Sequence, residues 1–202
     1  MNTAFRIALC LVIATVSESY SQSVSPAQNE DVANFEKQNG AAVQRFKEIR
    51  LSDVATDAQA EVYRLMIFPT WGNAISIRVQ KHRGIYALSA RRLDGEAGFE
   101  VGHLVEQKDF DLTPTDAAAF DDLILKVNLF GMPSSDRVRG MDGDEWVIEG
   151  VSQGRYHFVD RWCATSDNPK KRGLADFNVL CRFLVNKSML SVRPTNKGRA
   201  LI

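Results

Sequence analysis

The sequence predicts an α+β fold: a mostly antiparallel sheet of about six strands, with helices packed on one face and an N-terminal helix before it. Stretches that alternate apolar and polar residues are separated by short loops, which favours antiparallel hairpins. Other segments carry apolar residues at the spacing of a helix. The expected order is helix, four strands, helix, two strands, helix, and this order is typical of an α+β domain.

The N-terminus has the features of a secretory signal. Arg6 supplies a positive charge, and the apolar run Ile7–Val16 is ten residues long, too short to span a bilayer. We predict cleavage after Ser21, export to the periplasm or the extracellular space, and no transmembrane segment after cleavage. The expected organisation is signal peptide 1–21, linker and N-terminal helix 22–58, α+β domain 59–190 and flexible tail 191–202.

The charge balance excludes some partner classes. The chain has 25 basic and 25 acidic residues among its 202. A neutral protein has no general field to attract nucleic acid, so no nucleic-acid partner is predicted.

The segment 29–50 has the pattern of a narrow-seamed helix. It leaves two interpretations open: a helix lying on its own domain, or a pairing helix that joins a homodimer. The seam residues are Val32, Phe35, Asn39, Ala42, Phe46 and Ile49.

The first strands are expected in hairpins. The strand 61–68 is followed by a turn and by the alternating residues Ile75, Ile77 and Val79. A four-residue loop, 81–84, would place Tyr86, Leu88 and Ala90 opposite Val79, Ile77 and Ile75. The next expected stripe is Phe99, Val101, His103 and Val105.

Two later helices have clear signals. Thr113 can cap a helix whose first turn holds Pro114. The last helix, 174–187, carries Leu174, Phe177, Cys181 and Leu184 on one face.

The stretch Asp142–Cys163, "DGDEWVIEGVSQGRYHFVDRWC", is predicted to be a hairpin with a three-residue loop at Ser152–Gly154. This register gathers the aromatic residues on one face and matches opposite charges on the other. The expected pairs are Val151–Arg155, Glu149–His157, Val147–Val159, Glu145–Arg161, Ile148–Phe158 and Trp146–Asp160.

The hairpin also resembles a known pattern. "DGDEWVIEG" with "GRYHFVDRWC" is similar to the motif DGxxWxxEG…GxYHxVxRW of an uncharacterised bacterial exported-protein family. The resemblance covers less than half of the chain. It implies a common domain and carries no activity.

The two cysteines after the signal, Cys163 and Cys181, are predicted to form a disulfide, because exported chains with an even cysteine count usually pair them. The short closed loop would contribute about 3 kcal/mol. No metal site is predicted, because two isolated cysteines lack the ligand spacing of zinc and Asp142–Glu145 lacks the later ligands of a calcium loop.

Few residues suggest catalysis. His157 is interpreted as a partner of Glu149, and His103 as a core or edge residue. Asp160 stands out as a carboxylate on the aromatic side of the hairpin. No nucleotide-binding or hydrolase motif is present in the sequence, and no cofactor is predicted.

Trp71, in the turn "FPTWGN", is the candidate binding residue, because an indole on a rigid turn can anchor a partner. It could also fold back over the end of the sheet. We therefore predict an exported, non-enzymatic domain that binds a protein or a cell-envelope component. The alternatives are a small secreted hydrolase using His103 or His157 with Asp160, and a structural homodimer through the helix 29–50.

Overall fold

The structure, a computed structural model, describes residues 26–97, 99–166 and 168–191. The predicted signal peptide and nearly all of the predicted tail lie outside these residues. Within them, no helix combines the length and the apolar character needed to cross a membrane.

The described residues follow the predicted order of elements, with two short helices added. The bounds are α1 Pro26–Arg45, α2 Leu51–Val54, β1 Glu61–Pro69, β2 Ile75–His82, β3 Ile85–Leu93, β4 Leu104–Asp111, α3 Pro114–Val127, the 3-10 turn Leu129–Gly131, β5 Asp144–Ser152, β6 Arg155–Trp162 and α4 Ala175–Ser188.

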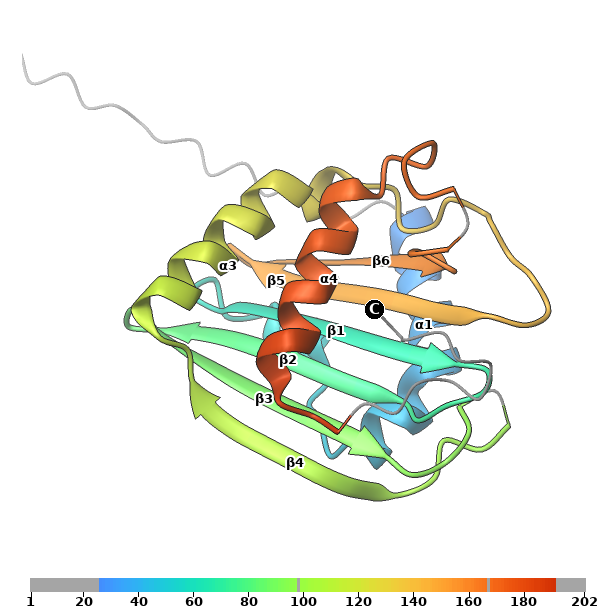
Figure 1. The fold of residues 1–202 in the computed structure, drawn as a ribbon. Helices are drawn as coiled ribbons and strands as arrows, with labels where there is room; N and C mark the ends of the chain where they lie inside the picture. The colour runs from blue at the N-terminus through green and yellow to red at the C-terminus, as the bar shows by residue number, and fades with distance from the viewer. Residues whose placement is uncertain (1–25, 98, 167, 192–202) are drawn as a thin grey trace, which may run out of the picture.

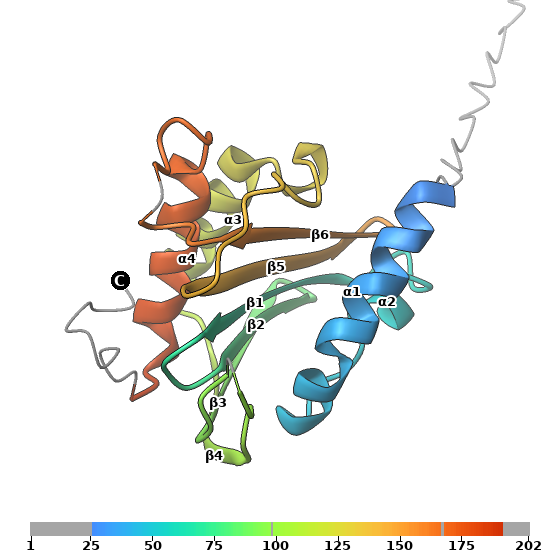
Figure 2. The ribbon, with the colours of Figure 1, turned by 90° about the vertical axis from the view of Figure 1, so that its right-hand side faces the viewer.

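The strands form one antiparallel sheet in the order β4-β3-β2-β1-β5-β6, which confirms the α+β prediction (Figure 1). Helices α3 and α4 cover one face, and α1 with the short α2 covers the other (Figure 2). The neighbouring inner strands β1 and β5 are therefore buried along most of their length.

Two large cores result from this three-layer arrangement, together with a small third cluster of Leu51, Val62 and Val151. Between the sheet and α3 and α4, Trp146 and Phe120 are nearly or fully buried, together with the expected apolar face of α4. Between the sheet and α1, Phe35 stacks on Phe158 with 4.5 Å between ring centroids, and Phe46 is fully buried. Phe35, Ala42 and Phe46 of the predicted seam thus pack on the same chain, whereas Ile49 is 47% exposed.

The predicted start of α3 is confirmed. The Thr113 hydroxyl accepts a hydrogen bond from the Asp116 amide at 3.2 Å, and Pro114 is the first helical residue. The N-cap satisfies an amide that the helix itself leaves without a partner.

The predicted register of the β5–β6 hairpin is wrong by one residue. Gln153 and Gly154 form a two-residue turn with φ of 53° and 72°, and Ser152 pairs with Arg155. Left-handed values at both turn positions match the favoured type I′ hairpin turn. A one-residue slip exchanges the faces, so Trp146 and Trp162 lie on opposite faces and Glu149 does not share a face with His157.

The register was mispredicted because helices cover both faces of the sheet. The prediction assumed one apolar and one polar face, whereas six consecutive residues of β5 are buried. In such a strand the pattern cannot fix the register, and the turn fixes it instead.

The β2–β3 hairpin has the same kind of turn at Arg83 and Gly84, with φ of 50° and 82°. Val79 pairs with Leu88 instead of Tyr86, and Ile77 with Ala90 instead of Leu88. A two-residue slip keeps every side chain on its face. The predicted apolar face is therefore present although the predicted partners are wrong.

The fourth strand begins later than predicted. Phe99, Val101 and His103 belong to the loop between β3 and β4, and the strand starts at Leu104. Gly102, in this loop, has φ of 76°, and a Cβ there would collide with the backbone of Gly95. The close approach of these two glycines holds the loop out of the ladder.

The predicted disulfide is not formed: Cys163 and Cys181 are both free thiols. Cys181 does face inward, into the core under α4, and burial raises the pKa of its thiol. Cys163 follows β6 in a turn with φ of 45°, and its sulfur lies against Gly143. The two sulfurs thus contact different parts of the molecule.

Reducing agent should therefore leave the melting temperature unchanged, because no bond constrains the unfolded chain. Thermal unfolding with and without dithiothreitol measures this. A clear drop in melting temperature on reduction would show that the two cysteines pair.

Candidate functional site

Trp71 lies in the turn between β1 and β2, where 37% of its surface is exposed. Its ring contacts Phe99 of the β3–β4 loop, with 5.1 Å between centroids and 51° between planes. Phe99 is itself 69% exposed. The indole thus neither stands alone nor folds into the core. We call this pair the aromatic surface.

The two loops that carry the aromatic surface are tied together. The amide of Ala97 donates to the carbonyl of Gly72 at 3.0 Å, and the side chain of Asn73 donates to the carbonyl of Gly95 at 3.0 Å. The Arg92 guanidinium donates a hydrogen bond to the side-chain oxygen of Asn73 at 3.2 Å. These bonds hold the two loops together in the absence of a partner, and a preformed backbone loses less entropy on binding.

A third loop meets the first at the same end of the sheet. The Thr70 amide donates to the carbonyl of Gly143 at 2.8 Å, and the Thr70 hydroxyl accepts from the Gly143 amide at 3.1 Å. Met141, two residues earlier, is 95% exposed. Three loops thus present large apolar side chains at one end of the molecule.

The structure does not bring the candidate catalytic residues together. His103 is exposed beside β4, one edge strand, whereas His157 and Asp160 belong to β6, the other edge strand. Along β6, His157 and Asp160 point to opposite faces, because they are three positions apart and side chains alternate along a strand. Neither candidate histidine therefore lies beside Asp160.

His157 has a structural environment. Its Nε2 is 2.8 Å from the carbonyl of Met132, and its ring lies 6.1 Å from that of Phe130. Burial lowers the pKa of His157, so the neutral ring is favoured.

Asp160 is buried on the face covered by α1 and pairs with Arg139. Burial raises the pKa of Asp160. Its diagonal neighbour Glu145 has a pKa raised to about 7, first by burial and then by the charge of Asp160. Two interacting carboxyl groups therefore lie near the outer edge of the sheet.

The raised pKa of Glu145 predicts a pH dependence of stability. Because the folded protein binds this proton more tightly than the unfolded chain, stability is fully present below about pH 4.5 and falls as the pH rises toward 7. Glu145→Gln should remove this fall and stabilise the protein by about 2–3 kcal/mol at pH 8, with little effect at pH 4.5.

Urea unfolding of both proteins at pH 4.5 and pH 8 measures the difference, in which the titrating groups that do not interact with Glu145 cancel. An equal difference at the two pH values would contradict the assignment to Glu145.

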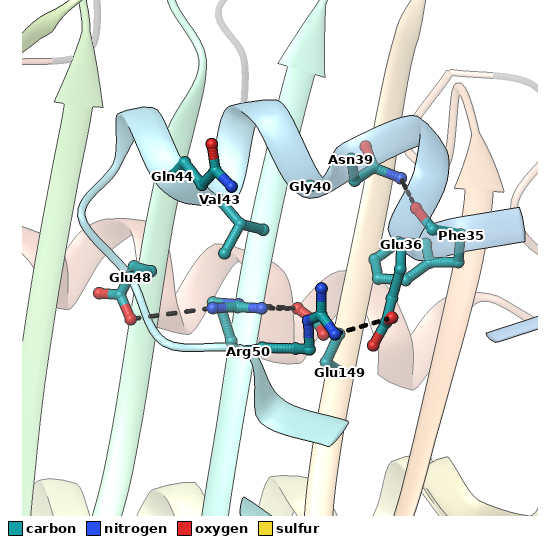
Figure 3. Close-up of a pocket in the computed structure, with 10 residues that line it drawn as sticks. Phe35, Glu36, Asn39, Gly40, Val43, Gln44, Glu48, Arg50 and Glu149 are labelled. Atoms are coloured by element: carbon teal, nitrogen blue, oxygen red, sulfur yellow. Dashed lines mark hydrogen bonds and ion pairs between the residues drawn. The ribbon is translucent and has the colours of Figure 1, made fainter. Parts of the chain in front are cut away.

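A pocket of about 170 Å³ lies between α1 and the sheet (Figure 3). Six residues of α1 line it from above, Glu48 and Arg50 line it from the segment after the helix, and Arg64 of β1 and Glu149 of β5 line it from the sheet. In Figure 3, Val43 points from the helix toward the sheet, and Arg50 reaches Glu36.

The inner end of this pocket is a buried charge cluster. Arg64 and Glu149 pair directly across β1 and β5, with Arg64 Nε 2.7 Å from Glu149 Oε2. Arg64 also lies opposite Arg78 of β2, and the two like charges are bridged by Glu48 at 3.8 Å and 2.7 Å. Tyr156 donates to the second oxygen of Glu149 at 2.9 Å.

Sequence reasoning missed this pocket and half of the aromatic surface. Arg64 interrupts an apolar strand, and Glu149 lies within another, so an ion pair between the two strands could have been inferred from the pattern. Gly40 lies on the pocket side of α1, and a Cβ added there would meet no atom within 4 Å. The sequence did not mark Phe99 as a surface residue, because its alternation with Val101 and His103 predicted a strand where the structure has a loop.

Comparisons with protein-family models, with curated proteins and with solved structures found no match to this chain.

Proposed function

We propose that this chain is an exported, non-enzymatic domain that binds another protein or a cell-envelope component through the aromatic surface. The observation that carries the proposal is the contact of Trp71 with Phe99 on two hydrogen-bonded loops. Large aromatic side chains on a rigid support supply much contact area at little entropic cost, and residues of this type dominate binding energies. Arg6 and the apolar run after it support export.

The other two functions have less support. A hydrolase would need a histidine beside Asp160, and both histidines are placed elsewhere. A homodimer through the helix 29–50 would need the helix seam, but Phe35, Ala42 and Phe46 of that seam are buried against the sheet of the same chain.

Photo-crosslinking tests the proposal. A benzophenone amino acid replaces Phe99 in the full chain, which is irradiated in envelope extract of the producing cell. We expect a discrete crosslinked product, because 69% of this side chain is exposed beside Trp71. The same amino acid at Ile85 is the matched control, since Ile85 is 56% exposed in the hairpin at the opposite end of the sheet.

A product that forms equally from both positions, or from neither, would contradict binding at the aromatic surface. A product specific to position 99 that disappears in a Trp71→Ala background would link the two rings to one partner.

A further inference from the structure

We infer that the partner of the aromatic surface is a protein segment that presents a lysine or arginine next to an apolar side chain. The inference rests on the proposed function and specifies the chemistry of the partner at the same surface. Three features of the two loops carry it: their acidic charge, a pair of glutamates that face each other, and the aromatic rings themselves.

The two loops that carry the aromatic surface are acidic. The turn between β1 and β2 has no charged residue, and the loop between β3 and β4 contains Asp94, Glu96 and Glu100 but no lysine or arginine. Asp94 has a structural role, because its Oδ1 accepts a hydrogen bond from the amide of His103 at 2.7 Å. Glu96 and Glu100 are both exposed, one on each side of Phe99 along the chain. The loops therefore attract cations and repel anions.

The two glutamates face each other across a tight turn. They form an isolated antiparallel bridge, and the carbonyl of Glu96 accepts hydrogen bonds from the amides of Phe99 at 2.8 Å and Glu100 at 2.9 Å. Residues opposite each other in such a bridge have Cβ atoms about 5 Å apart, and like charges at these positions destabilise the pair. A cation supplied by a partner would relieve this repulsion.

The chain itself does not neutralise the two glutamates. Neither forms an ion pair with another of the described residues. The two arginines that precede the loop are engaged along β4, Arg91 by Asp109 at 2.8 Å and Arg92 by Glu106 at 2.9 Å. The negative charge beside the aromatic surface is thus left to the solvent or to a partner.

The aromatic rings favour the same charge as the glutamates. The face of an indole attracts a lysine or arginine cation more strongly than the face of a phenyl ring does. Trp71 is 37% exposed, and its ring is held 5.1 Å from that of Phe99. A guanidinium or ammonium group beside the indole is attracted by both features, while its aliphatic stem and an apolar neighbour supply contact area for Phe99.

The acidic charge disfavours an anionic membrane as the partner. Surfaces that bind such membranes combine exposed apolar residues with lysine and arginine, whereas Phe99 stands between two glutamates. The third loop, which carries Met141, does contain Arg137 and Arg139, but Arg139 pairs with Asp160. The acidic side of the aromatic surface is therefore the side formed by the loop between β3 and β4.

Two short acetylated peptides serve as probes, one of alternating arginine and leucine and one of alternating glutamate and leucine. Titration of the full chain is followed by the indole NH signal of Trp71. We expect saturable binding of the arginine peptide and at least about tenfold weaker binding of the glutamate peptide, because like charges meet in the second case. Binding of the arginine peptide should weaken as salt is added, since salt screens exposed charges.

Glu96→Gln combined with Glu100→Gln removes the two charges and keeps the size of the side chains. This variant should bind the arginine peptide about fivefold more weakly, the effect of two exposed charge pairs, and should lose most of the salt dependence. Asp111→Asn combined with Asp122→Asn is the matched control. It also removes two exposed acidic charges, one at the far end of β4 and one on α3, and should leave binding unchanged.

Three results would overturn the inference: equal binding of the two peptides, no saturable binding of the arginine peptide up to about 10 mM, or unchanged binding by the Glu96→Gln, Glu100→Gln protein. Binding of phosphatidylglycerol vesicles through Trp71 would also overturn it and would assign the surface to lipid. The crosslink from position 99 judges the proposed function separately. A position-specific product that forms equally in the parent and in the glutamine variant would keep the binding surface and remove the cationic partner.

Discussion

Glu149→Gln should lower the free energy of unfolding by about 3–5 kcal/mol, the cost of leaving a buried charge without its partner. The side chains of Arg64 and Glu149 are 1% and 3% exposed, and they meet in the middle of the sheet. Once the carboxylate is lost, the nearest acidic oxygen to Arg64 is that of Glu48 at 3.8 Å, which Arg78 already uses. Urea unfolding at neutral pH measures the loss.

Asp109→Asn is the control for this prediction. The ion pair of Asp109 with Arg91 lies at the edge strand β4, and the aspartate side chain is 46% exposed, so its loss should cost no more than about 1 kcal/mol. The double variant Arg64→Met with Glu149→Leu should recover much of the stability that the single variant loses, because Glu48 keeps Arg78 and no buried charge is left without a partner. A Glu149→Gln protein as stable as the control would contradict the buried cluster.

Phe46→Ala should cost about 3–5 kcal/mol, because a fully buried aromatic side chain leaves a cavity when it is removed. Phe46 lies just after α1, and its ring centroid is 6.4 Å from that of Phe68 at the end of β1. The prediction distinguishes a helix that belongs to the domain from an arm that docks on a second chain. Thermal and urea unfolding measure it.

Lys37→Ala, at an exposed position of the same helix, should stay within about 0.5 kcal/mol of the parent protein. The melting temperature should also be independent of protein concentration. If the helix seam paired with a second copy, Phe46→Ala would have its effect on association, and the melting temperature would rise with concentration.

The order and type of the elements could be predicted from the sequence because their signals are local. Thr113 and Pro114 mark a helix start through backbone geometry alone, and the spacing of Leu174, Phe177 and Cys181 fixes the inward face of α4 without any knowledge of what it contacts. These signals act within a few residues, so the rest of the fold does not change them.

The hairpin registers and the sites depend on contacts between distant segments. For these features the predictions from sequence were wrong or incomplete. Glu149 has both His157 and Arg64 as plausible partners, and only the order of strands, with β1 beside β5, decides for Arg64. Trp71 could be singled out from its turn, but its partner Phe99 comes from a loop held by glycines 95 and 102. The pocket is formed by residues of α1, β1 and β5 together, so the sequence of any one of these segments does not predict it.

The affinity of the crosslinked partner for the Trp71→Ala chain tests the central claim most directly. Binding should weaken by about 30-fold or more, equivalent to about 2 kcal/mol, while the melting temperature changes little because Trp71 is part of no buried core. His103→Ala, an exposed change in the loop that also carries Phe99, should leave the affinity unchanged. An unaltered affinity of the Trp71→Ala chain for that partner would contradict the account.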